Sequence, residues 1–600
     1  MSYSNSFPTQ RPTLNLDFAN SGKLDSRISY ARSSTGTALS SERHLSSENL
    51  VPYSNLSSGF SVGRTTIAST NNSAPDGGSD AASILETADP TSSHEVYTSF
   101  SCVSGQQYSF VFYLKANGRT KAMVRPQMTS VIADVEFDLT AVTSTVVSGS
   151  ANSHSITAIG STGWYKCAVT VTATVTGTGF TQFNLLDAGG NIAYTGDVTK
   201  GMFAWGASVS STGETVLNET SGQIHREYAP TLKTASANEP RFEYTADGES
   251  EGLLIEAQSS NLFTRSSGFD YTAAWTKINV TATAEAISPD GTLNAFAIRE
   301  NTTTGTKRIY QAATVAAGAV AVSVYAKLMG NERRLVIRED STTGDSAVFD
   351  LSSGTVAATN VGGAGTIESV GNGWYRCTLI TSPSGSPGYQ FGFWLATATG
   401  TNYETYTGDG YSGVLLFGAQ VQNALAASSY IETLGSTATR SADSCSVATA
   451  DIGYTGGPVS IVSEFSGGTG YYPQIFELRD TVSKAGGVND YILPVKYSAA
   501  ANDSTDWRVW INESDNLTQT TISSSSSATQ IGVSVDTNSV ASCADGGTIY
   551  NATSTVIPDS LDTLYIGRGY SSTISINGHI KRVALYNVAL SDTELQALTS

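Results

Sequence analysis

The sequence predicts an all-β protein built from tandem antiparallel β-sandwiches of the jelly-roll type. Three observations predict this class: an internal repeat, apolar residues at every second position, and short runs separated by Gly, Ser and Asn. The chain has 600 residues, of which 57 are Gly, 14% are charged and 40% are hydrophobic. The apolar share excludes a globally disordered chain. At roughly 100–200 residues per domain, the length predicts three to five domains.

The internal repeat occupies the middle of the chain. The motif Gly163–Cys167 (Gly-Trp-Tyr-Lys-Cys) recurs as Gly373–Cys377 (Gly-Trp-Tyr-Arg-Cys). Further pairs occur in the same order at nearly the same shift: Asn49-Leu50 with Asn261-Leu262, Pro75-Asp76-Gly77 with Pro289-Asp290-Gly291, and Tyr194–Asp197 with Tyr406–Asp409. Matches that keep both order and spacing predict two homologous domains, at residues 46–215 and 259–440.

Alternating residues predict which side of each strand is buried. The expected inward-facing set is Tyr108, Phe110, Phe112 and Leu114 in the first repeat and Val320, Val322, Val324 and Ala326 in the second. Because side chains alternate across a strand, each set lines one face of an antiparallel sheet. The same face is therefore expected to be buried in both copies.

The remaining segments flank the repeats. Residues 1–45 are expected to form a separate N-terminal segment that anchors the protein, and residues 216–258 an ordered connector. Residues 450–600 are expected to form a third sandwich, distal to the anchor. Near the C-terminus, Asn577-Gly578 predicts a tight hairpin turn between 574–576 and 579–586. Ser591 and Glu594 predict a capping box that begins a short helix at 592–598.

The repeated Gly-Trp-Tyr motif allows two interpretations. Its aromatic residues, Trp164, Tyr165, Trp374 and Tyr375, could form a platform for a sugar ring. Alternatively, the Gly ends a turn and the aromatic residues pack in the core of the sandwich. Period-two alternation continues through the motif, and this favours the core interpretation.

No catalytic or metal-binding motif is present in the sequence. The five Cys are widely spaced and are expected to be buried, and the five His are scattered. Carboxylate pairs such as Asp76 and Asp80 lie in Gly-rich loops, where Asp is common for turn reasons. Calcium could bind such loops, but no calcium motif supports this, so no cofactor is expected. A glycosidase needs two carboxylates at a fixed separation, and no pair is selected by the sequence.

Charge and hydropathy restrict the partners. The net charge is −19, which argues against nucleic-acid and anionic-membrane partners because both require a basic patch. No apolar run approaches the roughly 18–20 residues needed to span a bilayer. The N-terminus shows neither the basic nor the apolar region of a secretory signal, so synthesis in a cytoplasm is expected.

Two resemblances cover most of the chain. Leu564–Gly567, Asn577–Ile580 and Val583–Asn587 resemble the laminin-G/concanavalin-A-like sandwich family. The two repeats resemble the carbohydrate-binding-module-like jelly rolls of bacteriophage head-spike and tail-fibre proteins. The residues that carry this second resemblance are Asn261-Leu262-Phe263, Ala274-Trp275, Ser288–Gly291, Ser323–Lys327 and Gly373–Cys377. The resemblance implies a virion component outside the capsid or tail whose sandwiches bind glycans.

Glycan binding requires exposed aromatic rings beside amide and carboxylate groups. In the last domain the candidates are Tyr471, Tyr472, Trp507, Trp510 and Tyr570. Trp507 and Trp510 are three residues apart, so a regular strand would point them to opposite faces and leave at most one exposed.

We therefore expect a non-enzymatic virion spike or fibre that displays β-sandwiches for weak, multivalent adhesion to host-surface glycans. Many copies on one particle would raise the effective affinity without strong single sites. Expected partners are other virion proteins, contacted through the N-terminal segment, and further copies of the chain, with a trimer as the expected state. The alternatives are a glycan-degrading tail protein and a purely structural capsid decoration.

Overall fold

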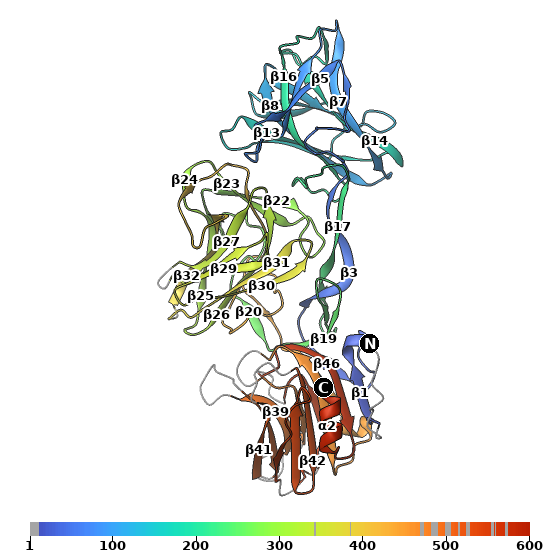
Figure 1. Cartoon of the computed structure of the whole chain (residues 1–600), viewed down its shortest axis with the longest axis vertical. Coiled ribbons are helices and arrows are strands. Elements are labelled where there is room, and N and C mark those ends of the chain that lie inside the picture. The colour runs from blue at the N-terminus through green and yellow to red at the C-terminus, as the bar shows by residue number, and fades with distance from the viewer. Residues whose placement is uncertain are drawn as a thin grey trace.

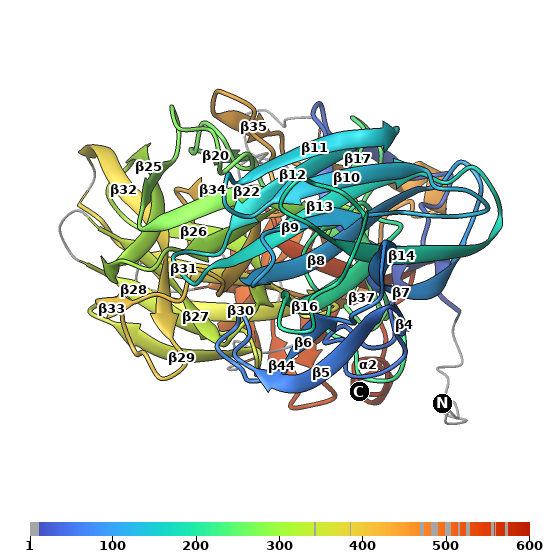
Figure 2. The same ribbon diagram turned by 90° about the horizontal axis from the view of Figure 1, so that it is seen from above.

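A computed structural model describes the chain as a row of three β-sandwich modules. The described residues are 11–340, 344–384, 386–468, 473–481, 490–497, 506–513, 516–523, 529–553, 557–558, 560–569 and 574–600. Repeat 1 lies at one end, repeat 2 in the middle, and the C-terminal sandwich at the other end, close to both termini (Figure 1). Viewed from above, repeat 2 projects to one side of the row (Figure 2). The predicted all-β fold of tandem antiparallel sandwiches is confirmed.

Repeat 1 consists of two antiparallel sheets. Its first sheet has the order β12–β13–β8–β16–β6–β5, formed by Ser153–Ala158, Trp164–Thr172, Gln107–Asn117, Gly201–Ser210, Ala81–Glu86 and Thr65–Asn72. Its second sheet has the order β11–β10–β9–β14–β7–β15, with β4 also paired to β7. These strands are Thr143–Gly149, Ala133–Asp138, Lys121–Val124, Gly177–Leu186, Ser92–Cys102, Ala193–Tyr194 and, for β4, Ser61–Gly63.

Repeat 2 has the same arrangement. Its first sheet, β22–β23–β34–β26–β31–β30, is formed by Val280–Ala286, Ala295–Glu300, Gly413–Gln422, Val320–Met329, Trp374–Thr381 and Ala364–Gly371. Its second sheet, β21–β25–β32–β27–β28–β29, is formed by Thr276–Ile278, Lys307–Val315, Ser386–Thr397, Arg333–Glu339, Ser346–Asp350 and Thr355–Asn360. Two short pairs complete the repeat: β24 with β33 (Thr304–Gly305, Tyr406–Thr407) and β20 with β35 (Ser259–Asn261, Ala438–Arg440).

The cores of the two repeats follow the predicted alternation. Tyr108, Phe110, Phe112 and Leu114 on β8 lie in the core between the sheets of repeat 1. Val320, Val322, Val324 and Ala326 on β26 occupy the same place in repeat 2. The expectation that both copies bury the same strand face is confirmed. All five Cys are buried, free thiols, as expected of small core residues.

The C-terminal sandwich also has two sheets. One has the order β18–β19–β46–β37–β42–β43–β44, with β1 also paired to β46. Its strands are Phe242–Tyr244, Ser250–Ile255, Gly578–Tyr586, Val459–Ser466, Gln530–Asp536, Ser539–Ala544, Tyr550–Ala552 and, for β1, Leu14–Asp17. The other, β2–β36–β45–β38–β39–β40–β41, is formed by Ser29–Ala31, Ser444–Ala448, Thr563–Ile566, Phe476–Arg479, Tyr491–Tyr497, Asp506–Glu513 and Asn516–Ser523. The 3-10 helix η1 (Thr449–Ile452) follows β36.

The expectation of a separate N-terminal segment at 1–45 is wrong for its described residues. β1 pairs with β46, and β2 pairs with β36, so both strands belong to the C-terminal sandwich. Leu14, Leu16 and Phe18, the last at the start of the short helix α1 (Phe18–Ser21), lie in its core. The C-terminal sandwich is therefore not distal to the N-terminal segment, because the two share one core.

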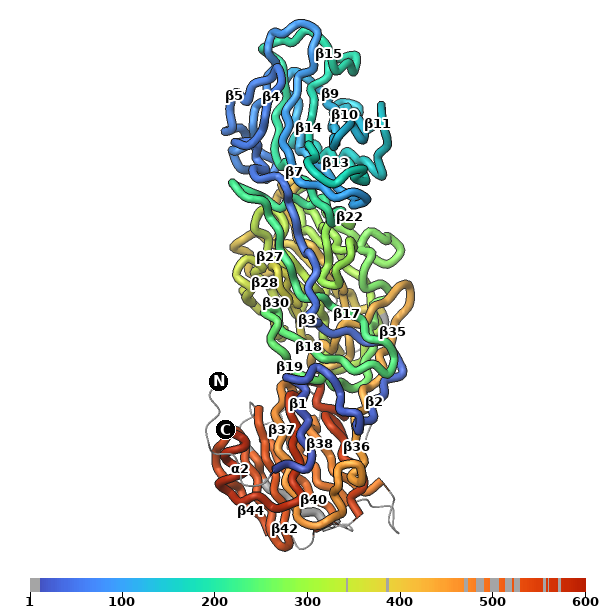
Figure 3. Tube along the Cα trace, turned by 90° about the vertical axis from the view of Figure 1, so that its right-hand side faces the viewer, coloured from blue at the N-terminus to red at the C-terminus, as the bar shows by residue number. Residues whose placement is uncertain are grey.

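A long two-stranded ribbon joins the modules. β3 (Gly36–Asn49) leaves the C-terminal sandwich toward repeat 1, and β17 (His225–Ala235) returns antiparallel to it. The ribbon runs along the side of repeat 2 (Figure 3). The residues at 216–258 are ordered as expected, but they are not an independent unit, since β17 belongs to the ribbon and β18 and β19 extend a sheet of the C-terminal sandwich.

The structure corrects one C-terminal prediction and confirms another. Asn577 has the positive φ expected of a turn, at 47°. The predicted hairpin between 574–576 and 579–586 is wrong. β46 pairs with β1, β19 and β37, and Ser575 makes an isolated bridge to Arg568 instead. The helix α2 (Asp592–Leu598) and its Ser591–Glu594 capping box are confirmed.

Candidate glycan-binding face

The aromatic residues expected to bind glycans in the C-terminal sandwich do not form a surface site in the described residues. Tyr471, Tyr472 and Tyr570 lie outside them. Trp507 is 0% exposed and its ring packs against that of Phe465, with centroids 5.1 Å apart. Trp507 is thus a core residue rather than a ligand platform. Trp510, three residues further on β40, is half-buried.

The repeated Gly-Trp-Tyr motif places its two aromatic residues on opposite sides of a strand. Tyr165 and Tyr375 pack against the cores between the sheets. Trp164 and Trp374 point the other way, and each is 1% exposed. Trp164 shares a buried cluster with Tyr411 of repeat 2, and Trp374 shares one with the ribbon. The core interpretation is therefore correct for the tyrosines, whereas Trp164 is buried against repeat 2 and Trp374 against the ribbon.

The first sheet of each repeat is covered on its outer face. In repeat 1, Tyr113 and Trp205 contact Tyr411 of repeat 2, with ring centroids 5.8 and 5.6 Å apart. In repeat 2, Trp374 lies in one cluster with Leu39 and Leu232 of the ribbon. All these sheet residues belong to the first sheets, so the second sheets are the ones whose outer faces are left for a ligand.

The second sheet of repeat 1 carries an aromatic pair on its outer face. Val96 on β7 and Phe183 on β14 point into the core, so Tyr97 and Phe180 point outward. Both are half-buried, and their rings meet edge to face with centroids 6.1 Å apart. Each ring holds the other in place, which leaves aromatic surface at a fixed position.

Amide and carboxylate groups lie directly beside this aromatic pair. Gln182 is opposite Tyr97 in the strand register. Its amide Nε2 donates to Glu95 Oε2 at 2.8 Å and to Asn184 Oδ1 at 3.1 Å. The Nδ2 of Asn184 is buried and has no hydrogen-bond partner within the described part of the chain. Gln182 is 6% exposed and Asn184 0%, so the half-buried Glu95 is the polar group of this set that a ligand at the rings can reach.

Ion pairs border the face on its other side. Arg125 Nε lies 2.6 Å from Asp134 Oδ1, and Lys121 Nζ lies 2.8 Å from Glu136 Oε1. The hydrogen bond from Lys121 to Glu136 raises the pKa of Lys121. These pairs hold the long side chains of Arg125 and Lys121 against carboxylates of the neighbouring strand β10. We call Glu95, Tyr97, Phe180, Gln182 and Asn184 the repeat-1 face.

The equivalent face of repeat 2 has a different character. Tyr310 pairs with Gly392, as Tyr97 does with Gln182. Trp394, at the position of Asn184, is 1% exposed and lies in a small apolar cluster with Val336. Arg308 and Arg338 both bind Asp340. The Arg308 guanidinium lies 5.5 Å from the Trp394 ring centroid and covers it. Repeat 2 therefore buries Trp394 beneath ion-paired arginine side chains, whereas repeat 1 keeps Tyr97 and Phe180 partly exposed.

Tyr97 and Phe180 were not among the residues predicted from the sequence to bind a ligand. The available signal was the alternation itself: Tyr97 adjoins the inward-facing Val96, and Phe180 has the same parity as the outward-facing Gln182. An aromatic residue at an outward position is a candidate for ligand contact. The sequence alone does not show that this outward face is free while that of β8 and β13 is covered.

The described residues show neither a cluster of metal ligands nor a membrane-spanning helix. The described residues contain no group of three or more His, Cys, Asp or Glu side chains that could hold a metal ion. No helix in this part of the chain is long and apolar enough to cross a membrane.

Comparisons with known proteins find similar structures but no family. No family model and no curated protein matches the chain. Among solved structures, the NanB sialidase of Streptococcus pneumoniae is 16% identical over 25% of this chain and 26% of the sialidase, with a TM-score of 0.21. The tandem CBM22 domains of Paenibacillus barcinonensis Xyn10C are 10% identical over 64% of this chain and 99% of theirs, with a TM-score of 0.18. The LG1-3 region of the laminin alpha2 chain is 10% identical over 84% of this chain and 97% of its own, with a TM-score of 0.19. These likenesses do not assign a ligand to this chain.

Proposed function

We propose that the protein is a non-enzymatic virion-surface adhesin that binds host-surface glycans through the repeat-1 face. The observation that carries the proposal is the partly exposed Tyr97–Phe180 pair beside Glu95, whose carboxylate accepts a hydrogen bond from Gln182. An aromatic ring packs on the apolar side of a sugar ring, and neighbouring amide and carboxylate groups bond its hydroxyls.

The arrangement of the modules supports this role. Repeat 1 lies at the end of the row opposite both termini (Figure 1). A particle that holds the chain through its N-terminal residues would therefore present repeat 1 outward. The sequence resemblance to phage head-spike and tail-fibre proteins supports attachment to other virion proteins, and display as an oligomer, with a trimer as the expected state, would add avidity.

The test compares variants of the full chain on a glycan array. Tyr97→Ala combined with Phe180→Ala removes the aromatic surface, and we expect it to lower the array signal by roughly tenfold or more, as loss of about 1.5–3 kcal/mol of buried aromatic contact implies. The matched control is Tyr310→Ala, at the equivalent position of repeat 2, which should leave the signal unchanged.

Three results would contradict the proposal. Equal loss in both variants would place the binding elsewhere. No binding by the wild-type chain to any array glycan, together with a stable particle-bound copy, would favour a structural decoration. Shortening of a host polysaccharide during incubation would favour the glycan-degrading alternative. A thermal unfolding scan of each variant shows whether lost binding reflects lost folding.

A further inference from the structure

A recess lies where repeat 2, the ribbon and the C-terminal sandwich meet. It is a cleft of about 580 Å³, lined among others by Glu243, Tyr244, Asp247, Glu251, Glu368 and His579. This volume is within the range of about 300–1,000 Å³ typical of small-molecule sites, and such sites are common between domains. The cleft is separate from the repeat-1 face, whose residues do not line it.

On the wall formed by the C-terminal sandwich, the charged side chains are paired with one another. His579 Nε2 lies 2.7 Å from Glu243 Oε2, and the backbone N–H of Leu39 donates to Glu243 Oε1 at 3.1 Å. Burial alone would raise the pKa of Glu243, but the hydrogen bond and the charge of His579, together with the Leu39 N–H, outweigh burial and lower it. Lys581 Nζ lies 3.6 Å from a carboxylate oxygen of Glu251. These charges are matched within the wall.

Two carboxylates that face this cleft are not matched in this way. Glu368 lies on β30 of repeat 2, and Asp247 lies in the turn between β18 and β19. Both side chains are exposed, and neither has a hydrogen-bond or ion-pair partner among the residues that the structure describes. The loss of water around Glu368 within the cleft raises the pKa of its carboxyl group. The positive charge of Arg376, its cross-strand neighbour, lowers that pKa but does not cancel the rise.

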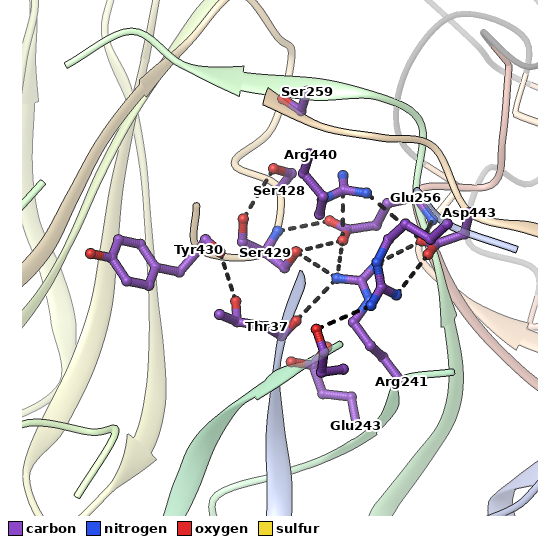
Figure 4. Close-up of polar contacts among 12 residues, drawn as sticks. Thr37, Arg241, Glu243, Glu256, Ser259, Ser428, Ser429, Tyr430, Arg440 and Asp443 are labelled. Carbon is purple, nitrogen blue, oxygen red and sulfur yellow. Dashed lines mark hydrogen bonds and ion pairs between the residues drawn. The ribbon is translucent and has the colours of Figure 1, made fainter. Parts of the chain in front are cut away.

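The floor beneath the cleft is held by a buried polar network (Figure 4). Arg241 donates to Glu256 at 2.7 Å, to Asp443 at 2.5 Å and to Ser429 Oγ at 2.7 Å. These residues come from the connector, from repeat 2 and from the start of the C-terminal sandwich. The walls of the cleft are therefore fixed relative to one another, which lowers the ordering cost of binding.

We propose that this cleft is a second saccharide-binding site, which takes a short neutral oligosaccharide whose hydroxyls donate to Glu368 and Asp247. A carboxylate only accepts hydrogen bonds, and sugar hydroxyls are abundant donors. Arg376 also lines the cleft and has no ion-pair partner among the described residues, so the walls carry both signs of charge. They therefore suit a neutral ligand whose hydroxyls can both donate and accept. This inference rests on the proposed function and extends it: one chain carries two glycan sites on different modules.

The test is calorimetric titration of the full chain with cellohexaose, maltohexaose and a β-1,3-glucan hexamer. Glu368→Gln combined with Asp247→Asn is expected to weaken the cleft component by roughly tenfold, because hydrogen bonds to charged acceptors are lost. Glu249→Gln is the matched control, since Glu249 is an exposed acid in the same turn that does not line the cleft.

The variant without the repeat-1 aromatic pair separates the two proposals. In the Tyr97→Ala/Phe180→Ala variant, a hexasaccharide should still bind at one site per chain. Adding Glu368→Gln and Asp247→Asn to this variant should then remove that binding. If this background binds none of the three hexasaccharides, the cleft proposal is wrong, whatever the wild-type chain binds. Binding of oligolysine but of no saccharide would reassign the cleft to a cationic ligand, and cleavage of a hexasaccharide would replace binding by hydrolysis; both overturn the proposal.

Discussion

At the residue scale, whether a side chain can contact a ligand depends on what covers it. Trp507 is a large aromatic residue in a strand and resembled a surface candidate, yet it is completely buried. Tyr97 has the same outward parity on β7 that Tyr113 has on β8, but Tyr113 is covered by Tyr411 and Tyr97 is not covered by a second module. Residue type and strand parity could be predicted from the sequence, whereas exposure could not.

The ion pair between His579 and Glu243 predicts a pH dependence at this scale. The pKa of His579 is raised by its hydrogen bond with Glu243 despite burial, so its contribution to the free energy of unfolding is fully present below 6.5 and is lost as pH rises through the raised value. The lowered pKa of Glu243 makes its contribution present above 4.5 and lost as pH falls through the lowered value.

His579→Gln should therefore be less stable than wild type mainly between these limits, and the difference should shrink at alkaline pH. Denaturant unfolding at a series of pH values measures this. His154→Gln is the control, because His154 is exposed on β12 (Ser153–Ala158). A difference between His579→Gln and wild type that does not change with pH would show that the pair contributes packing rather than charge.

At the scale of elements, local signals succeeded where partners are close in sequence. The capping box of α2 joins residues three apart, and the start of the helix follows from that local pattern. The hairpin at Asn577 failed because β46 pairs instead with β1, more than 500 residues away in the chain. A turn residue specifies a local backbone conformation but not the strand that a segment joins.

The pairing of β1 predicts that the N-terminal strand stabilises the far end of the chain. Leu16 is 2% exposed in the core of the C-terminal sandwich. Leu16→Ala should cost about 2–5 kcal/mol, because it leaves a cavity there. Scanning calorimetry should show the unfolding transition of the C-terminal sandwich shifted down, with those of the repeats unchanged.

Asn15→Ala, on the exposed side of the same strand, is the control and should change stability by less than about 0.5 kcal/mol. If Leu16→Ala left every transition in place, the shared core of β1 and β46 would be contradicted.

At the scale of the whole molecule, buried charges link the modules. Glu285 of repeat 2 binds Lys166 of repeat 1 at 2.7 Å and Arg299 of its own repeat at 2.6 Å. Burial alone would raise the pKa of Glu285, but the two cations lower it to about 2, and burial lowers the pKa of Lys166 to about 8. The carboxylate is therefore charged at neutral pH and compensates two buried cations.

Glu285→Gln should release repeat 1 from repeat 2, because it leaves Lys166 and Arg299 without their shared anion. The expected cost is about 3–5 kcal/mol of stabilisation between the modules. Small-angle X-ray scattering should then report a wider distribution of distances within the molecule, with the repeats still folded. Glu227→Gln, on the ribbon strand β17, is the control and should scatter like wild type. An unchanged distribution for Glu285→Gln would mean that the aromatic contacts of Tyr411 suffice to hold the repeats together.

The sequence by itself determined the all-β class, the two homologous repeats, the inward face of their strands, and the final helix with its cap. These features depend on residues a few positions apart or on the direct comparison of two similar segments. Only the tertiary structure decided that β1 and β2 complete the C-terminal sandwich, that the first sheets are covered, that Tyr97 and Phe180 stay partly exposed, and that the cleft is open. The physical reason is that alternation at period two assigns each side chain to one of two faces of a sheet, whereas contacts between residues hundreds of positions apart decide which of those faces is buried.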